Sequence, residues 1–200
     1  MYKRQIDVDV TEGVVWLRGR VNSYAQRLAA RAAAHRVVGV LDVADDLRVV
    51  LSPDQQRSDV DLARAVREAL EWSVFVPDRR IHSTVSDGWV TLDGTVGTLA
   101  QRADAVAAVE RLQGVQGVGN QIIVESPIIA SARIKSDIEK AMMRQARWPG
   151  DGVQVSVDDG VVTLTGQVHS WDERQALGQV VASALGVRQV VDRLRVDPST

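Results

Sequence analysis

The sequence predicts an α+β protein of three tandem small units, each ordered helix, strand, strand, helix, strand. Each unit should form a three-stranded mixed sheet with helices packed on one face, and the first unit should lack its first helix. Two observations lead to this prediction. A sixteen-residue pattern occurs three times, as EGVVWLRGRVNSYAQR, DGWVTLDGTVGTLAQR and DGVVTLTGQVHSWDER. Helix-start and helix-stop signals recur at the same offsets in every copy.

The three copies keep one register along the chain. Gly13, Gly88 and Gly160 stand at the same point of the pattern, 75 and then 72 residues apart. The length of 200 residues would suggest one or two domains, but the repeat indicates three. Units of this size bury only about 60% of their unfolded surface, so each is marginally stable by itself.

Each copy opens with an acidic residue and a glycine, which predict a tight turn, and continues as a strand. Val15, Leu17 and Val21 alternate on one face of that strand in the first copy. The strand is interrupted each time by a glycine: Gly19, Gly94 and Gly166. A glycine inside a strand indicates close backbone approach, and we expect a helix to pack tightly there.

The helix after this strand begins at a capping box, in which Ser or Thr is followed three residues later by Gln or Glu. The pairs are Ser23 with Gln26, Thr98 with Gln101, and Ser170 with Glu173. Each helix ends in Gly-Val, which is typical of a left-handed cap followed by an apolar residue that folds back. A final strand follows in every copy.

Units two and three each begin with a further amphipathic helix after a polar linker that contains proline. Its apolar stripe is Leu62, Val66 and Leu70 in unit two, and the third unit repeats the spacing. Unit one has no such helix. Its first five residues, MYKRQ, are the translation of the end of a transposase adapter used in sequencing libraries, so we expect them to be non-native and the first helix to have been cut off. The alternative is a genuine start with a degenerate first unit.

The expected boundaries follow from these elements. They are 1–5 for the adapter-derived segment, 6–51 for the truncated first unit, 52–57 for a linker, 58–125 for the second unit, 126–130 for a linker, and 131–197 for the third unit.

Composition excludes several classes of function. The net charge of −2 argues against a nucleic-acid binder, which needs a clustered basic surface. The absence of cysteine excludes disulfides, thiolate metal sites and a cysteine nucleophile. No apolar run reaches the roughly 20 residues that span a bilayer, so we expect no transmembrane segment. His35, His82 and His169 occupy nonequivalent repeat positions without metal-ligand spacing, so we expect no catalysis, metal or cofactor.

The units resemble the BON domain, which is found in bacterial osmotic-stress and nodulation proteins. The resemblance rests on DGxVTLxGxV, the capped helix with its arginine, and the closing GVxxVxN/D, and it covers nearly the whole chain. Copy one departs from the pattern at Glu12 and Trp16 and in its missing first helix. The resemblance implies a non-enzymatic module associated with cell-envelope stress that binds phospholipid surfaces or other proteins. It favours the periplasm or cell envelope, with the cytoplasm as the alternative.

An arginine recurs at one position of the repeated helix: Arg27, Arg102 and Arg174. One interpretation is a site for an anion or a lipid headgroup. We favour a structural role instead, in which each arginine lays its stem over the core edge and pairs with the turn acid, Glu12, Asp87 or Asp159.

The tryptophans are the remaining candidates for a binding surface. Trp16 and Trp89 fall on the strand face opposite the core, where packing between repeats is favoured over an external ligand. Trp72, Phe75 and Trp148 gather near the ends of the leading helices, where plugging of the core is favoured over contact with a bilayer because acidic residues dilute the cations of those helices.

Two functions follow from the sequence. The first is a stress-responsive, envelope-associated module that binds anionic phospholipid surfaces, with Arg102, Arg174, Trp148, Trp16 and Trp89 as the candidate surface. The second is a protein-interaction or chaperone-like scaffold without a lipid role. In the first, three weak contacts in one chain would act together through their raised effective concentration.

Overall fold

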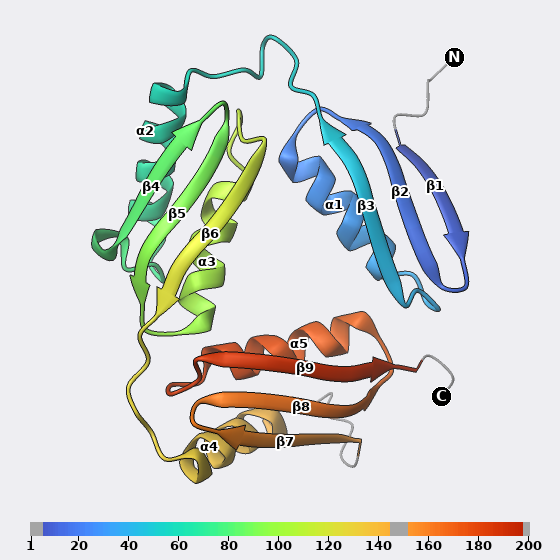
Figure 1. Cartoon of the computed structure of the whole chain (residues 1–200), viewed down its shortest axis with the longest axis vertical. Coiled ribbons are helices and arrows are strands. Elements are labelled where there is room, and N and C mark those ends of the chain that lie inside the picture. The colour runs from blue at the N-terminus through green and yellow to red at the C-terminus, as the bar shows by residue number, and fades with distance from the viewer. Residues whose placement is uncertain (1–5, 145–151, 198–200) are drawn as a thin grey trace. The chain divides into compact units, whose positions relative to one another are not determined.

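The computed structural model describes residues 6–144 and 152–197. In this part the chain forms three sheets of three strands, ordered β1-β2-β3, β4-β5-β6 and β7-β8-β9 (Figure 1). The predicted α+β fold of three repeated units, the first without a leading helix, is confirmed. The expected non-native segment 1–5 lies outside the described residues.

The elements follow the predicted order within each unit. The first unit contains β1 (Ile6–Thr11), β2 (Val14–Val21), α1 (Tyr24–His35) and β3 (Asp42–Val49). The second contains α2 (Asp59–Trp72), the 3-10 helix η1 (Asp78–Arg80), β4 (Ile81–Ser86), β5 (Trp89–Val96), α3 (Leu99–Glu110) and β6 (Gly117–Val124). The third contains α4 (Ser131–Met143), β7 (Val153–Asp158), β8 (Val161–Val168), α5 (Trp171–Ser183) and β9 (Gln189–Val196).

A tight hairpin joins the first two strands of each unit. β1 is antiparallel to β2 and β2 is parallel to β3, and the third unit repeats this arrangement in β7, β8 and β9. Both turn residues have positive φ, 49° and 81° at Glu12 and Gly13 in the first unit, and the equivalent residues of the other units behave alike. Two-residue hairpins need this left-handed backbone at both positions, which explains why an acidic residue is followed by glycine in every copy.

The mid-strand glycine is required by a close backbone approach, but its neighbour is a strand. A Cβ on Gly166 would lie 1.8 Å from the carbonyl oxygen of Gly152, and a Cβ on Gly94 would lie 2.0 Å from that of Arg80. These carbonyls directly precede β7 and β4. The expectation that a helix packs tightly against the glycine is therefore wrong. The antiparallel partner strand makes this contact, because its first residue pairs with the glycine.

The capping boxes form as the sequence predicts. In α1 the Gln26 N–H donates to Ser23 Oγ at 3.2 Å, and the Gln26 side chain accepts from the Asn22 N–H at 2.9 Å. In α5 the Glu173 N–H donates to Ser170 Oγ at 3.2 Å, and its carboxylate accepts from the His169 N–H at 2.7 Å. The returning bond thus goes to the residue before the cap, and it satisfies one more amide at the helix start.

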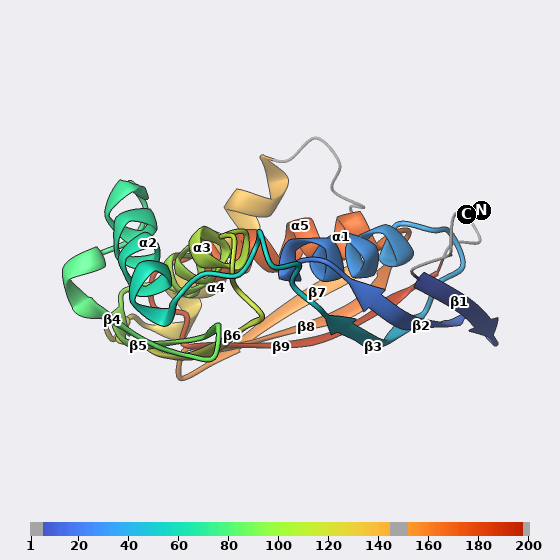
Figure 2. The same ribbon diagram turned by 90° about the horizontal axis from the view of Figure 1, so that it is seen from above.

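The first unit buries a smaller core than the third, because among the described residues no helix covers β1. Figure 2 shows α1 on one side of its sheet, and α2 on one side of β4 and β5. In the third unit α4 buries Ile134, Ile138 and Met142 over the sheet. Val8, which pairs with buried Leu17, is 57% exposed, whereas its equivalent Val155 under α4 is 8% exposed.

Candidate functional site

The repeated arginine ties its helix to the last strand of the unit. Arg27 Nε donates to Asp45 Oδ2 at 3.0 Å, and Arg174 Nε donates to Asp192 Oδ2 at 2.6 Å. The predicted pairing with the turn acids is therefore wrong for these two arginines. The reason is geometric: the turn precedes β2 or β8, whereas the helix starts after that strand has ended, so a full strand separates the two groups.

The turn acid of the third unit has another partner. Asp159 pairs with Arg188, whose Nη2 lies 2.5 Å from Asp159 Oδ1 and also donates to the Asp159 carbonyl. In the second unit the repeat register puts Asn120 where Asp45 and Asp192 stand, so Arg102 has no equivalent carboxylate there. The repeated arginine is thus a structural tie in units one and three.

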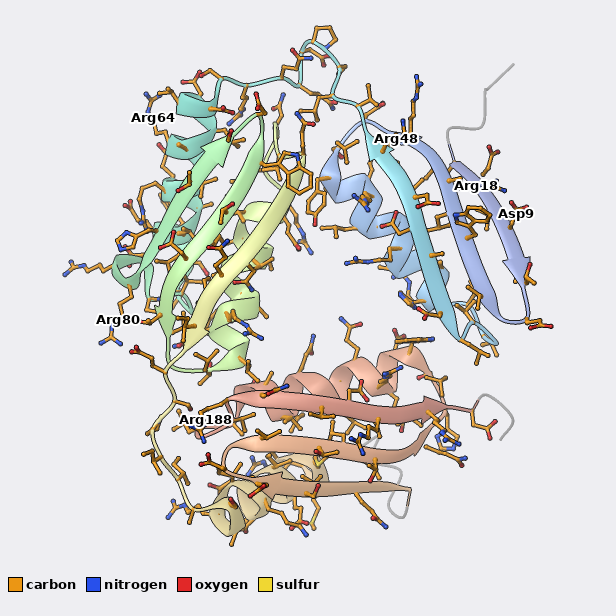
Figure 3. The ribbon with its side chains drawn as sticks, viewed as in Figure 1. Asp9, Arg18, Arg48, Arg64, Arg80 and Arg188 are labelled. Atoms are coloured by element: carbon orange, nitrogen blue, oxygen red, sulfur yellow. The ribbon has the colours of Figure 1, made fainter. Side chains whose placement is uncertain are left out.

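Trp16 lies on the open face of the first sheet, where its own neighbours engage it. The indole N–H donates to Asp46 Oδ2 at 2.7 Å, and the Arg18 guanidinium lies 4.1 Å from the centre of its ring. Arg18 also pairs with Asp9 on β1, and Figure 3 shows these two side chains next to each other. Trp16 remains 42% exposed.

Trp89 lies on the open face of the second sheet and is 54% exposed. Its ring lies directly over Gly117, where an added Cβ would be 2.4 Å from the indole. The sequence placed both tryptophans on the face opposite the core, and the alternating burial of β2 and β5 agrees.

Two further tryptophans belong to the third unit. Trp148 lies outside the described residues. Trp171 opens α5, and the Arg174 guanidinium lies 4.7 Å from the centre of its ring. Because Arg174 already binds Asp192, this cluster has an evident structural role.

The most exposed apolar residues follow α2. Trp72 is 86% exposed, Val74 is 91% exposed and Phe75 is 72% exposed. We call these three residues the apolar tip. The expectation that Trp72 and Phe75 plug the core is therefore wrong: Val76 is the residue of this loop that is buried. The helical period contained the signal, because Trp72 follows Leu70 by two positions and so falls on the opposite side of α2 from the buried stripe.

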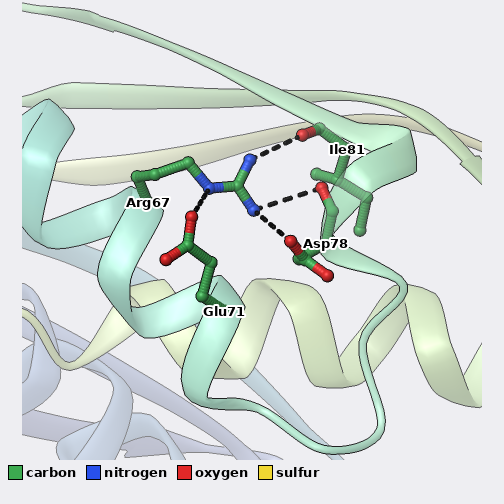
Figure 4. A network of polar contacts seen from close by, with 4 residues as sticks. All are labelled: Arg67, Glu71, Asp78 and Ile81. Atoms are coloured by element: carbon green, nitrogen blue, oxygen red, sulfur yellow. Dashed lines mark hydrogen bonds and ion pairs between the residues drawn. The ribbon is translucent and has the colours of Figure 1, made fainter.

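Arg67 holds the loop that carries the apolar tip (Figure 4). Its guanidinium donates to the carbonyl of Asp78 at 3.1 Å and to that of Ile81 at 3.2 Å. It also forms ion pairs with Glu71 at 3.2 Å and with the Asp78 carboxylate at 3.5 Å. One arginine thus joins α2, η1 and β4, and its single positive charge is shared between the two carboxylates next to the tip.

Two further cations stand at the base of the apolar tip. Arg79 and Arg80 are both exposed, and Figure 3 shows Arg80 extending away from the ribbon. Arg79 and Arg80 thus add two positive charges to a region that also holds exposed Glu68 and the two carboxylates shared by Arg67. The surface therefore combines large apolar side chains with two exposed arginines.

The described residues offer no cluster of metal-ligating side chains, counted as three or more His, Cys, Asp or Glu together. Within residues 6–144 and 152–197, no helix has both the length and the apolar character needed to cross a bilayer.

Comparison with known proteins gives a match in sequence and a match among solved structures. It is 31% identical over 121 residues to osmotically-inducible protein Y of Escherichia coli strain K12, a match that covers 58% of this chain and 60% of that protein. Among solved structures, it resembles CdsD, a structural protein of the type III secretion system of Chlamydia trachomatis. That likeness has 15% identity, covers 98% of this chain and 87% of the other, and has a TM-score of 0.30, which is too low to carry an argument about function.

The family comparison matches all three units. The BON domain model matches residues 3–50, 58–126 and 130–198, which together make up most of the chain. The chain belongs to the BON domain family.

Proposed function

We propose that this chain is a non-catalytic bacterial stress protein whose tandem BON domains, at 6–51, 58–125 and 131–197, bind anionic phospholipid surfaces. The observation that carries the proposal is the apolar tip with Arg79 and Arg80 at its base. An exposed cluster of large apolar side chains is characteristic of a contact surface, and cations beside it favour an anionic membrane over a neutral one.

The expected energies suit weak, reversible binding. Burial of a Trp or Phe side chain contributes about 2 kcal/mol when it is complete, and an interfacial position gives part of that. Each arginine near an anionic surface contributes about 1 kcal/mol. The tip belongs to the second unit, which would bind weakly by itself, and further contacts by the other two units would strengthen the attachment through their effective concentration.

The comparisons support a role in osmotic stress. The similar Escherichia coli protein is osmotically inducible by its name, and this chain spans 60% of its length. We propose that this chain acts in the same kind of stress, at the cell envelope, where phospholipid surfaces are available. Nothing in the proposed contact requires a catalytic group.

The test is co-sedimentation with vesicles of phosphatidylglycerol and of phosphatidylcholine at low and high salt. The intact chain should sediment with the anionic vesicles at low salt, and the double variant Trp72→Ser/Phe75→Ser should lose most of this binding. Val38→Ser/Ile128→Ser is the matched control, because it removes two apolar side chains, 83% and 97% exposed, that lie outside every candidate surface. Equal binding by the tip variant and the control would refute the role of the tip.

The other candidate residues predicted from the sequence can be substituted and tested in the same vesicle assay. Arg102, Arg174, Trp148, Trp16 and Trp89 stay secondary candidates for the lipid surface. The alternative function is a protein-interaction scaffold, which the exposed Trp89 ring over Gly117 favours. If the intact chain ignores both kinds of vesicle, the lipid proposal fails and the scaffold becomes the leading hypothesis.

A further inference from the structure

Two arginines stand side by side on the first sheet. Arg20 on β2 and Arg48 on β3 are register partners in a parallel pair, and both are exposed. Adjacent strands lie about 4.8 Å apart, so the two guanidinium groups can reach the same ligand. Like charges placed directly opposite each other on neighbouring strands are destabilising unless something of opposite charge lies between them.

The charged groups around this arginine pair are engaged elsewhere. An open hollow of about 610 Å³ is lined by four arginines and two aspartates: Arg18, Arg20, Arg27, Arg48, Asp45 and Asp46. Arg27 binds Asp45, whose other oxygen accepts the Leu47 N–H. The carboxylate of Asp46 accepts the Trp16 indole N–H.

Arg18 is also occupied, since it stacks on Trp16 and pairs with Asp9. Within the described part of the chain, Arg20 and Arg48 are the lining arginines with no carboxylate partner. The excess positive charge of the hollow therefore lies at Arg20 and Arg48, whose strand positions are register partners.

We propose that Arg20 and Arg48 form a binding site for a phosphate-class oxyanion. A tetrahedral phosphate offers several oxygens, so it can accept hydrogen bonds from two guanidinium forks at once, and arginine suits this geometry better than lysine. The excess of arginine over aspartate in the hollow favours an anion with more than one negative charge. The ligand can be free phosphate or the headgroup of a lipid, because the same oxygens are presented by both.

The other units provide an internal comparison. In the third unit the equivalent register partners are Gln167 and Arg195, so one arginine of the pair is replaced by an amide. The repeat register gives Thr95 and Ile123 in the second unit. The site therefore belongs to the first unit, and Arg20→Gln introduces a side chain that this fold already accepts at the same position.

The first arm of the test uses inorganic phosphate. Titration of the intact chain with potassium phosphate, against potassium chloride at equal ionic strength, should shift the arginine Nε–H resonances of Arg20 and Arg48 in a ¹H–¹⁵N spectrum. The variant Arg20→Gln/Arg48→Gln should show no saturable shifts in the first unit. The control Arg31→Gln/Arg36→Gln removes two exposed arginines, one in α1 and one directly after it, and should retain the response. Identical shifts in phosphate and chloride would overturn the proposal unless the lipid arm shows a response.

The second arm distinguishes the source of the phosphate. If a lipid headgroup is the ligand, Arg20→Gln/Arg48→Gln should bind phosphatidylglycerol vesicles at least fivefold more weakly than Arg31→Gln/Arg36→Gln, which removes the same number of positive charges. If free phosphate is the ligand, phosphate should shift the resonances while the two variants bind vesicles equally. Absence of both responses refutes the site, and vesicle binding through the apolar tip would still stand on its own.

Discussion

Asp192 divides its two carboxylate oxygens between a backbone amide and an arginine. Oδ1 accepts the Leu194 N–H at 2.9 Å, and Oδ2 accepts Arg174 Nε at 2.6 Å. Asp45 makes the same division in the first unit, toward Leu47 and Arg27. The aspartate thus shapes its own strand and fixes the start of the helix above it.

Replacement of Asp192 by Asn should weaken this tie while keeping the Oδ1 bond. The expected cost is about 1 kcal/mol, because the pair is partly exposed and solvent screens part of its charge. Hydrogen exchange should report it as roughly fivefold faster exchange of the amides in α5 and β9. Asp158→Asn, at an exposed position of β7, is the control and should leave those amides unchanged.

Gly166 and Gly178 should respond in opposite directions to alanine. At Gly166 an added Cβ would lie 1.8 Å from a backbone oxygen and φ is +125°, so Gly166→Ala should destabilise the third unit by at least about 2 kcal/mol. Gly178 lies inside α5 with nothing within 4 Å, so alanine there should stabilise the helix by up to about 1 kcal/mol. Thermal unfolding followed by circular dichroism compares the two. A mild effect of Gly166→Ala would contradict the close strand approach.

Replacement of Arg67 by Met should reduce vesicle binding although Arg67 is not part of the apolar tip. The substitution keeps much of the apolar stem and removes two hydrogen bonds to backbone carbonyls and two ion pairs, so the loop after α2 should loosen. Glu71 and Asp78 would also lose their shared counter-charge beside the tip. We expect faster hydrogen exchange around η1 together with weaker binding to phosphatidylglycerol vesicles.

Arg64→Met is the matched control for this prediction. Arg64 is exposed on the same helix and pairs only locally with Asp61 among the described residues. If both variants bind vesicles equally, the contacts of Arg67 do not position the apolar tip.

Val155 and Val8 occupy equivalent positions but should differ in their contribution to stability. Val155 lies in the core of the third unit, so Val155→Ala should cost about 2 kcal/mol through lost burial and an unfilled space. Val8 is 57% exposed, so Val8→Ala should lower the free energy of unfolding by less than about 0.5 kcal/mol. Chemical denaturation with a probe in each unit measures both values. Equal costs would show that Val8 is covered in solution.

Most of the fold followed from the sequence because the repeat supplied each signal three times. The turn at Asp159 and Gly160 and the capping box at Ser170 and Glu173 depend on neighbours in the chain, so local patterns predict them well. The sequence also predicted that backbone approaches Gly166 closely. It did not predict that this backbone belongs to the partner strand, because strand pairing decides which segment lies there.

The binding surfaces were harder to predict because they depend on contacts between distant segments. The partner of Arg174 is 18 residues away in β9, and the order of charged residues along the chain does not indicate which acidic residue it is. The pair formed by Arg20 and Arg48 needs the parallel register of β2 and β3, which no local motif fixes. Trp72 and Phe75 depart from the tendency of large apolar residues to be buried, and only for Trp72, at the end of α2, does the helical period indicate the exposed side.

The uncovered sheet of the first unit has a consequence for how that unit would respond to a ligand. A domain with a small core has a small free energy of unfolding, and a ligand that binds only the folded form raises that free energy by an amount that grows with its concentration. An oxyanion bound at Arg20 and Arg48 would therefore change the folded population of the first unit more visibly than the same ligand on a well-covered unit. The concentration of such an anion in the surroundings would then determine what fraction of the first unit is folded.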